Sequence, residues 1–176
     1  MRDICVYCGS RNGADPEFAK AADEIGAGLA KLGLGLVYGA GDIGLMGRVA
    51  DAALKNGASV LGVIPEHLAA KEVSKSELSE LIVVDTMHER KMMMFERSDA
   101  FIALPGGPGT LDEVIELLTW RQLGLHDRPV YILNIKGYWD PLVALLEKTV
   151  EMEFAEPGFL DYFETHDSVK SLLAAL

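Results

Sequence analysis

The chain has 176 residues, of which 49% are hydrophobic, and a formal net charge of −11. This length suits a single domain, residues 1–176, with a well-buried core. The negative charge argues against a surface that holds nucleic acid or anionic lipid mainly by electrostatics. No apolar run approaches the ~20 residues of a membrane-spanning helix, and the sequence starts without a signal-peptide pattern. We therefore expect a cytoplasmic protein that has neither nucleic acid nor a membrane as its partner.

Six short apolar runs have the nearly continuous hydrophobicity of parallel strands that are covered on both faces. They span residues 3–7, 34–38, 59–64, 81–84, 100–104 and 130–134. Helical patterns lie between them, so that strand and helix alternate along the chain. This order predicts an α/β, Rossmann-like fold, in which a doubly wound parallel sheet of six or seven strands has helices on both faces.

Six helices are predicted from apolar residues at helical spacing and from signals at the helix ends. Asp15 and Pro16 begin the first helix, and Gly33 ends it. The other five span residues 44–56, 87–97, 110–123, 139–151 and 167–176. Asp85 or Thr86 is expected to cap the helix that starts at Met87.

The two cysteines, Cys5 and Cys8, have the spacing of a redox or zinc motif. Cys5 lies within a predicted strand, where side chains three residues apart point to opposite faces of the sheet. A second cysteine pair is missing from the sequence, and the four histidines are scattered along it. We therefore expect two small buried side chains in a reducing compartment, and no metal site.

Four polar or glycine-rich segments follow predicted strands. They span residues 8–13, 38–47, 85–91 and 104–113. Ligands of doubly wound sheets bind beyond the carboxyl ends of the strands, so these segments are expected to meet at one edge. Their joint placement favours a site of about nucleotide size.

One of these segments also matches the dinucleotide-binding pattern, with glycines at positions 39, 41 and 44. An NAD enzyme must therefore be considered. The motif follows the second strand rather than the first, and the acid at the expected spacing, Glu66, lies beyond Pro65. We therefore prefer close packing of a helix as the reason for these glycines.

The segment from Leu104 to Glu113 joins a strand to a helix through a glycine-rich turn. Gly106, Gly107 and Gly109 allow backbone N–H groups to approach an anion, and the dipole of the following helix favours negative charge there. A phosphorylated ligand is the expected occupant of this turn.

Glu113 has two interpretations. Thr110 and Glu113 have the spacing of a capping box, in which their side chains only satisfy backbone N–H groups. Alternatively, Glu113 is a catalytic carboxylate beside the anion-binding turn. Glu116 lies on the same helix face and is unnecessary for capping, which favours the catalytic interpretation.

The helix that starts at Met87 places Met87, Arg90, Lys91 and Met94 on one face. A solvated charged helix with methionines in the core would explain this pattern. The helix begins at the expected ligand edge, however, so Arg90 and Lys91 can offset phosphate charge or polarise a leaving group. Met87 can then lie against an aromatic base.

These motifs together resemble the Lonely Guy (LOG) family of cytokinin riboside 5′-monophosphate phosphoribohydrolases, once widely mislabelled lysine decarboxylases. The matching segments are Val6-Tyr-Cys-Gly-Ser10, Val37-Tyr-Gly39 with Gly44-Leu-Met-Gly47, Met87-His-Glu-Arg-Lys91, Pro105-Gly-Gly-Pro-Gly-Thr-Leu-Asp-Glu113 and Thr119-Trp-Arg-Gln-Leu-Gly124. The resemblance implies hydrolysis of the N-glycosidic bond of AMP or N6-prenylated AMP, the step that activates cytokinins. It implies no cofactor, because nothing in the sequence identifies a pyridoxal phosphate site.

The resemblance also implies roles for individual residues. It places the catalytic arginine at Arg90 and the catalytic glutamate at Glu113. Expected substrate contacts are Gly9, Ser10, Glu72, Met87, Lys91, Gly106, Gly107, Pro108, Gly109, Thr110, Glu116 and Thr119. The nucleoside monophosphate is the expected small-molecule partner.

Two positions depart from the family pattern. Ala40 replaces the middle glycine after the second strand, and Pro108 removes one N–H from the phosphate-binding turn.

A non-catalytic carrier of a nucleotide or of the molybdenum cofactor on the same fold is the alternative function. The family is typically dimeric, and the helix around residues 120–123 is the expected partner surface.

Overall fold

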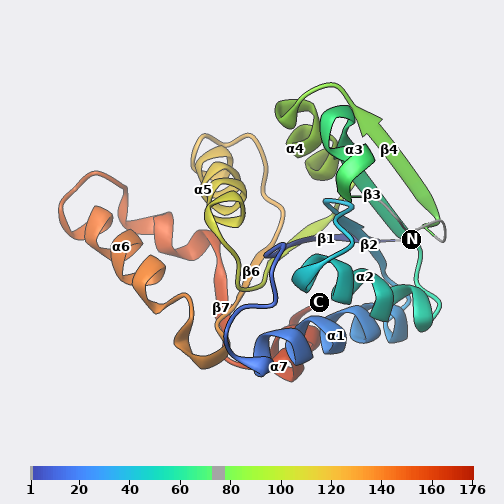
Figure 1. Cartoon of the computed structure of the whole chain (residues 1–176). Coiled ribbons are helices and arrows are strands. Elements are labelled where there is room, and N and C mark those ends of the chain that lie inside the picture. The colour runs from blue at the N-terminus through green and yellow to red at the C-terminus, as the bar shows by residue number, and fades with distance from the viewer. Residues whose placement is uncertain (1, 73–77) are drawn as a thin grey trace.

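The computed structural model describes residues 2–72 and 78–176, except for the side chains of residues 70–72. Within these ranges the strands form one parallel seven-stranded sheet in the order β4-β3-β2-β1-β5-β6-β7. The strands are β1 (Asp3–Tyr7), β2 (Gly35–Tyr38), β3 (Val60–Pro65), β4 (Glu80–Val84), β5 (Ala100–Ala103), β6 (Val130–Leu133) and β7 (Glu164–His166). The prediction of a doubly wound parallel sheet is confirmed (Figure 1).

Seven α-helices and two 3₁₀ helices accompany the sheet in the described part of the chain. They are α1 (Pro16–Lys31), α2 (Gly44–Lys55), α3 (Glu66–Glu72), α4 (Met87–Glu96), α5 (Pro108–Gln122), α6 (Asp140–Glu151) and α7 (Val169–Ala175), with η1 (Ile135–Gly137) and η2 (Pro157–Tyr162). The sequence patterns missed α3 and β7, because both are too short to show a hydrophobic period. None of the helices in the described ranges has the length and apolar character needed to cross a membrane.

Two hydrophobic cores lie on opposite faces of the sheet. Helices α1, α2 and α7 cover one face, with Ile25 and Val49 fully buried, and α4, α5 and α6 cover the other. Cys8 lies in the first core and Cys5 in the second, and both are free. The prediction that the two cysteines face opposite ways is therefore confirmed, and a joint redox or metal site is excluded for them.

The strand order changes direction at β1: β2, β3 and β4 are added on one side of this strand, and β5, β6 and β7 on the other. This strand pairs with β2 on one side and with β5 on the other, so the segments that follow β1 and β5 diverge to opposite faces. Such a reversal leaves a crevice at the carboxyl ends of the strands, where ligands of this fold class bind. The backbone N–H of Gly9 donates to the carbonyl of Pro105 at 3.0 Å, which ties the two segments together beside the crevice.

The helices α4 and α5 start at this crevice, and each has its own start signal. The Thr86 side chain accepts a hydrogen bond from the N–H of Glu89 at 3.1 Å, so Thr86, rather than Asp85, caps α4. Helix α5 starts at Pro108 instead of Thr110, with Gly107 as its N-cap residue. A proline suits the first position of a helix, because the N–H that it lacks has no partner within the helix.

Candidate active site

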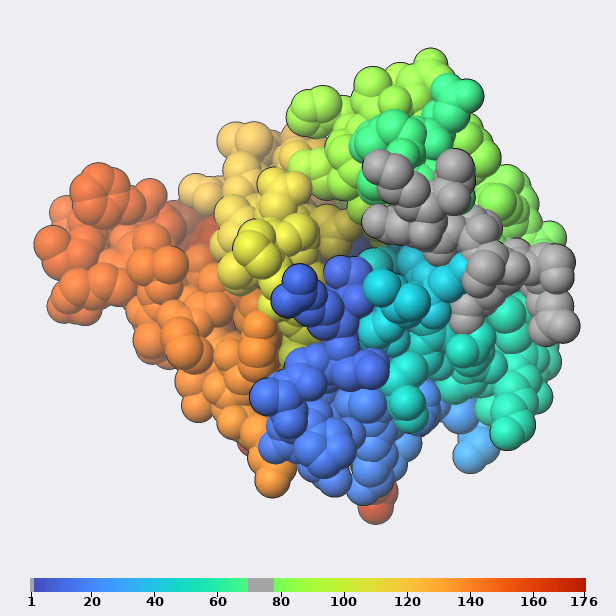
Figure 2. All heavy atoms as spheres, in the orientation of Figure 1, coloured from blue at the N-terminus to red at the C-terminus, as the bar shows by residue number. Residues whose placement is uncertain are grey.

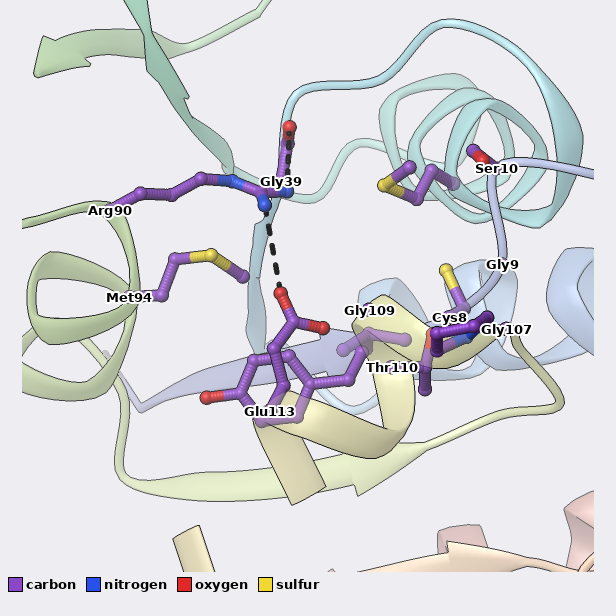
Figure 3. Close-up of a pocket in the computed structure, with 14 residues that line it drawn as sticks. Cys8, Gly9, Ser10, Gly39, Arg90, Met94, Gly107, Gly109, Thr110 and Glu113 are labelled. Atoms are coloured by element: carbon purple, nitrogen blue, oxygen red, sulfur yellow. Dashed lines mark hydrogen bonds and ion pairs between the residues drawn. The ribbon is translucent and has the colours of Figure 1, made fainter. Parts of the chain in front are cut away.

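A cavity of about 180 Å³ lies at the carboxyl end of β1, between α4 and the start of α5 (Figure 3). Residues that follow β1, β2 and β5 line it together, as their glycine-rich segments predict. The expected site residues in its wall are Gly9, Ser10, Arg90, Gly107, Pro108, Gly109, Thr110 and Glu113. In Figure 2 the segment after β1 (blue) and the first turns of α5 (yellow) meet at the surface.

The first turn of α5 forms one end of this cavity. Its early N–H groups, including those of Gly109 and Thr110, have no carbonyl partner within the helix, and the helix dipole places partial positive charge there. Pro108 contributes no N–H, but it fixes the backbone in the helical conformation. This end of the cavity therefore suits a phosphate group.

The structure excludes a capping role for Glu113. Because α5 starts at Pro108, Thr110 lies inside the first helical turn, and the N-cap residue Gly107 has no side chain to form a capping box. The capping-box interpretation of Thr110 and Glu113 is therefore wrong. Instead, the Glu113 carboxylate points across the cavity toward Arg90 (Figure 3).

Arg90 is buried and is held by three oxygen atoms. Its Nε donates to the Val63 carbonyl and its Nη2 to the Gly39 carbonyl, both at 3.2 Å, while Nη1 lies 3.7 Å from Oε1 of Glu113. Val63 lies in the second half of β3 and Gly39 directly follows β2, so the carboxyl-terminal side of the sheet fixes the guanidinium opposite Glu113. A Cβ atom at position 39 would lie 1.7 Å from Nη2, so any other residue there would displace the guanidinium from this position.

Burial changes the acid strength of Glu113. Its side chain is only 11% exposed, and the removal of water raises its pKa to about 7 despite the opposing effect of Arg90. Near neutral pH the group is therefore present in both its protonated and its ionised form, as a general acid or base requires. Burial also raises the pKa of the Cys8 thiol well above its usual range, which makes this neighbouring side chain a poor nucleophile.

Two methionines line the cavity, and neither is Met87. Met94 of α4 and Met46 of α2 contribute to the wall, whereas Met87, the first residue of α4, is 40% exposed and is not part of the wall. Thioethers pack well against aromatic rings, and the thioethers in the wall of this cavity are those of Met46 and Met94. Met94 was predicted to lie on the same helix face as Arg90, and Met46 belongs to the segment Gly44-Leu-Met-Gly47, to whose side chains the sequence analysis gave no role.

Other expected contacts lie outside this cavity. The Lys91 Nζ atom binds Asp112 Oδ2 at 2.9 Å and Glu116 Oε2 at 3.0 Å. Thr119 and Glu116 line a shallow groove on the outer side of α5, and Gly106 lines a larger cavity beyond the phosphate-binding turn. Glu72 ends α3, but its side chain lies outside the described part of the structure.

The glycine-rich segment after β2 serves the site through its backbone. Gly44 has a φ of +66°, and a Cβ atom there would lie 2.2 Å from the carbonyl carbon of Ser10. The absence of a side chain at Gly44 therefore allows the segment after β1 to pack against the start of α2. Ala40 also has a positive φ, 58°, although it is not a glycine. The methyl group costs roughly 1–2 kcal/mol in this conformation, a cost that a glycine at position 40 would avoid.

Across residues 2–72 and 78–176, no three His, Cys, Asp or Glu side chains are grouped as they would be around a metal ion. The charged groups that the cavity offers a ligand are the Arg90 guanidinium and the Glu113 carboxylate.

Comparison with solved structures supports the fold. A molybdenum cofactor carrier protein from Chlamydomonas reinhardtii superposes with a TM-score of 0.75 at 20% sequence identity, covering 99% of this chain and 95% of that one. A molybdenum cofactor binding protein from Rippkaea orientalis gives 0.74 at 23% identity, covering 99% and 95%. At this level of identity the similarity shows a shared fold.

Comparison with curated sequences is more specific. Residues 46–176 match the model of a family described as "Possible lysine decarboxylase". The probable cytokinin riboside 5′-monophosphate phosphoribohydrolase LOGL1 of Oryza sativa subsp. japonica is 52% identical over 145 residues, which are 82% of this chain and 65% of that protein. The Arabidopsis thaliana phosphoribohydrolase LOG1 is 44% identical over 176 residues, the whole of this chain and 83% of its own length. The chain belongs to the LOG family.

Proposed function

We propose that this protein hydrolyses the N-glycosidic bond of purine nucleoside 5′-monophosphates, releasing the free base and ribose 5-phosphate. The observation that carries this proposal is the buried Glu113 carboxylate, which faces Arg90 in a cavity whose other end is the start of α5. The names of the LOG relatives support the same activity. The match spans just under two thirds of the length of LOGL1. The activity and the substrate are therefore proposals for this chain.

The phosphate end of the substrate binds at the first turn of α5. Backbone N–H groups of Gly109 and Thr110 donate to it, and the Ser10 hydroxyl lies in the same wall. The 5′-phosphate then directs the ribose into the cavity toward Glu113. The base lies beyond the ribose, where the thioethers of Met46 and Met94 provide an apolar wall.

The reaction breaks the bond between C1′ and the base nitrogen, and the electron pair leaves with the base. The sugar passes through an oxocarbenium-like state, whose positive charge the ionised Glu113 stabilises. Water then adds to C1′, and Glu113, with its pKa of about 7, takes up the proton that this water loses. This proton then passes to the nitrogen of the departing base, so that the base leaves neutral and the carboxylate is restored. Arg90 keeps Glu113 oriented and partly ionised, and stabilises negative charge that develops on the departing base.

We propose AMP and N6-prenylated AMP as substrates, which would give the protein an AMP nucleosidase activity and a role in cytokinin activation. The test is incubation with purine and pyrimidine 5′-monophosphates, with and without N6 substituents, followed by chromatography of the free base. Adenine or prenyladenine should appear from the monophosphates, and adenosine should be a poor substrate because it lacks the phosphate. Tight binding of a monophosphate without release of base would instead favour a non-catalytic carrier.

We also propose a homodimer that is joined through the outer side of α5. Leu111 and Ile115 are 37% and 38% exposed there, and they line an open groove of about 550 Å³ together with Thr119 and Trp120. Exposed apolar side chains along one helix are typical of a surface that a second copy covers. In such a dimer Thr119 and Glu116 would meet the partner, beside the catalytic cavity.

Substitution of this apolar surface should dissociate the dimer. Charged side chains in the double variant Leu111→Glu/Ile115→Glu cannot be buried without a large desolvation cost, so the mass measured by light scattering should fall from dimer to monomer. Phe154→Ser is the matched control, because Phe154 is 85% exposed and distant in sequence from α5. A wild-type mass of one chain at every protein concentration would refute the homodimer.

The cytoplasm is the compartment that we propose for this reaction. The two cysteines of the chain are free and buried, which is consistent with a reducing compartment.

A further inference from the structure

Lys91 lies next to Arg90 in α4, yet it forms a separate set of ion pairs. Its Nζ atom binds Asp112 at 2.9 Å and Glu116 at 3.0 Å, and its side chain is only 9% exposed. We call Lys91, Asp112 and Glu116 the Lys91 cluster. The two carboxylates flank Glu113 on α5, one residue before it and one turn after it.

The Lys91 cluster and the Arg90–Glu113 pair form two adjacent bridges from α4 to α5. The bridges of Lys91 are shorter than the 3.7 Å between Arg90 and Glu113. Charge-assisted hydrogen bonds of this length have a defined geometry, so the cluster fixes how far α5 lies from α4 and how it is turned. Arg90 and Glu113 belong to the wall of the cavity, whereas the three side chains of the cluster do not.

We propose that Lys91 is a positioning residue, which holds Glu113 opposite Arg90 by binding the carboxylates on either side of it. The family resemblance implies instead that Lys91 contacts the substrate. Among the described residues, the two hydrogen bonds that the Lys91 side chain donates both go to α5, and its ammonium is directed at carboxylates rather than into the cavity. The kinetic part of this inference rests on the proposed hydrolysis, but the structural part does not.

The charges around Glu113 give the proposal a second observable. Arg90 and Lys91 face Glu113 from α4, Asp112 and Glu116 lie beside it on α5, and the weakly acidic Tyr7, Cys5 and Cys8 approach from β1 and its end. After burial, which has the largest effect, Arg90 and Lys91 lower the pKa of Glu113, while Asp112 and Glu116 raise it. Removal of the Lys91 charge leaves two unpaired carboxylates next to Glu113 and must raise its pKa further.

The experiment compares Lys91→Met and Lys91→Arg with the wild type. Lys91→Met keeps the length of the side chain but removes its charge, whereas Lys91→Arg keeps the charge. For AMP hydrolysis at neutral pH, Lys91→Met should lower kcat roughly tenfold to a hundredfold, the cost of a misplaced catalytic group, and change KM by no more than about twofold. Lys91→Arg should restore most of kcat. Lys148→Met, which removes an exposed lysine paired with Glu151, is the matched control and should change neither constant.

The pKa of Glu113 is measured separately, from the pH dependence of its carboxyl ¹³C chemical shift, which is assigned by its absence in Glu113→Gln. Lys91→Met should move this titration to higher pH. Asp112→Asn/Glu116→Gln, which keeps Lys91 but removes both neighbouring carboxylates, should move it to lower pH. A melting curve shows whether Lys91→Met folds. If it does not, the double variant alone tests whether the Lys91 cluster acts on Glu113.

Opposite results would overturn the inference. A raised KM with unchanged kcat and an unchanged Glu113 titration in Lys91→Met would show that Lys91 contacts the substrate. An unchanged titration in Asp112→Asn/Glu116→Gln would likewise show that the cluster does not act on Glu113. If the wild type releases no base, the proposed hydrolysis fails, but the titrations still test whether Lys91 acts on Glu113.

Discussion

Glu113→Gln is expected to lower kcat for AMP hydrolysis by about a thousandfold or more, with little change in KM. Glutamine keeps the shape of the side chain, but it has no negative charge to stabilise an oxocarbenium-like sugar and cannot take a proton from water. The first turn of α5, where we propose that the phosphate binds, stays intact, so we expect the variant still to bind the substrate. Chromatography of adenine released from AMP at pH 7 measures the loss.

The stability of this variant separates a catalytic role from a structural one. The unfolded chain releases the Glu113 proton near pH 4.5, whereas the folded protein releases it near pH 7. The folded state therefore binds this proton more tightly, and wild-type stability declines as pH rises between these values, by roughly 3 kcal/mol from this group. Glu113→Gln removes that decline.

The difference in stability between Glu113→Gln and the wild type should therefore favour the variant more at pH 8 than at pH 4. Melting curves at the two pH values test this expectation. A variant that is destabilised equally at both pH values would show that Glu113 has a structural role, and retained turnover would refute its catalytic one.

Arg90→Ala is expected to lower kcat by roughly a hundredfold to a thousandfold. The substitution removes the positive charge that favours the ionised form of Glu113. It also removes the guanidinium hydrogen bonds to the carbonyls of Val63 and Gly39. Loss of these two charge-assisted hydrogen bonds should cost about 1.5–3 kcal/mol each in stability. The pH at which activity rises should also move upward, because the pKa of Glu113 rises when Arg90 is absent.

Arg90→Lys provides the second measurement. Lysine keeps the positive charge but cannot reproduce the planar set of donors that reaches Val63, Gly39 and Glu113. We expect activity between that of Arg90→Ala and that of the wild type. Arg97→Ala is the matched control, since Arg97 follows the same helix but pairs with the exposed Glu80. Wild-type turnover by Arg90→Ala would show that this face of α4 has been assigned wrongly.

The strands and the glycine-rich turn before α5 are encoded locally, which is why they could be predicted. Strand β1 occupies residues 3–7 as expected, and its neighbours differ from expectation by a residue at their ends. Continuous apolar runs and glycine-rich turns depend on short-range backbone and burial preferences. The start of α5 was predicted two residues late, because the glycine N-cap and Pro108 compete with the capping-box pattern of Thr110 and Glu113.

The sequence by itself determined the doubly wound α/β class, the edge at which the site lies, and Arg90 and Glu113 as its two candidate catalytic groups. Only the tertiary structure decided how these two groups lie relative to each other and how acidic Glu113 is. The 3.7 Å approach of Arg90 to Glu113 depends on carbonyls from β2 and β3 and on the absence of a side chain at Gly39. The pKa of Glu113 and the pairing of Lys91 with α5 likewise depend on burial and on partners far apart in the chain, since electrostatic energies are set by distance and solvent exclusion in space.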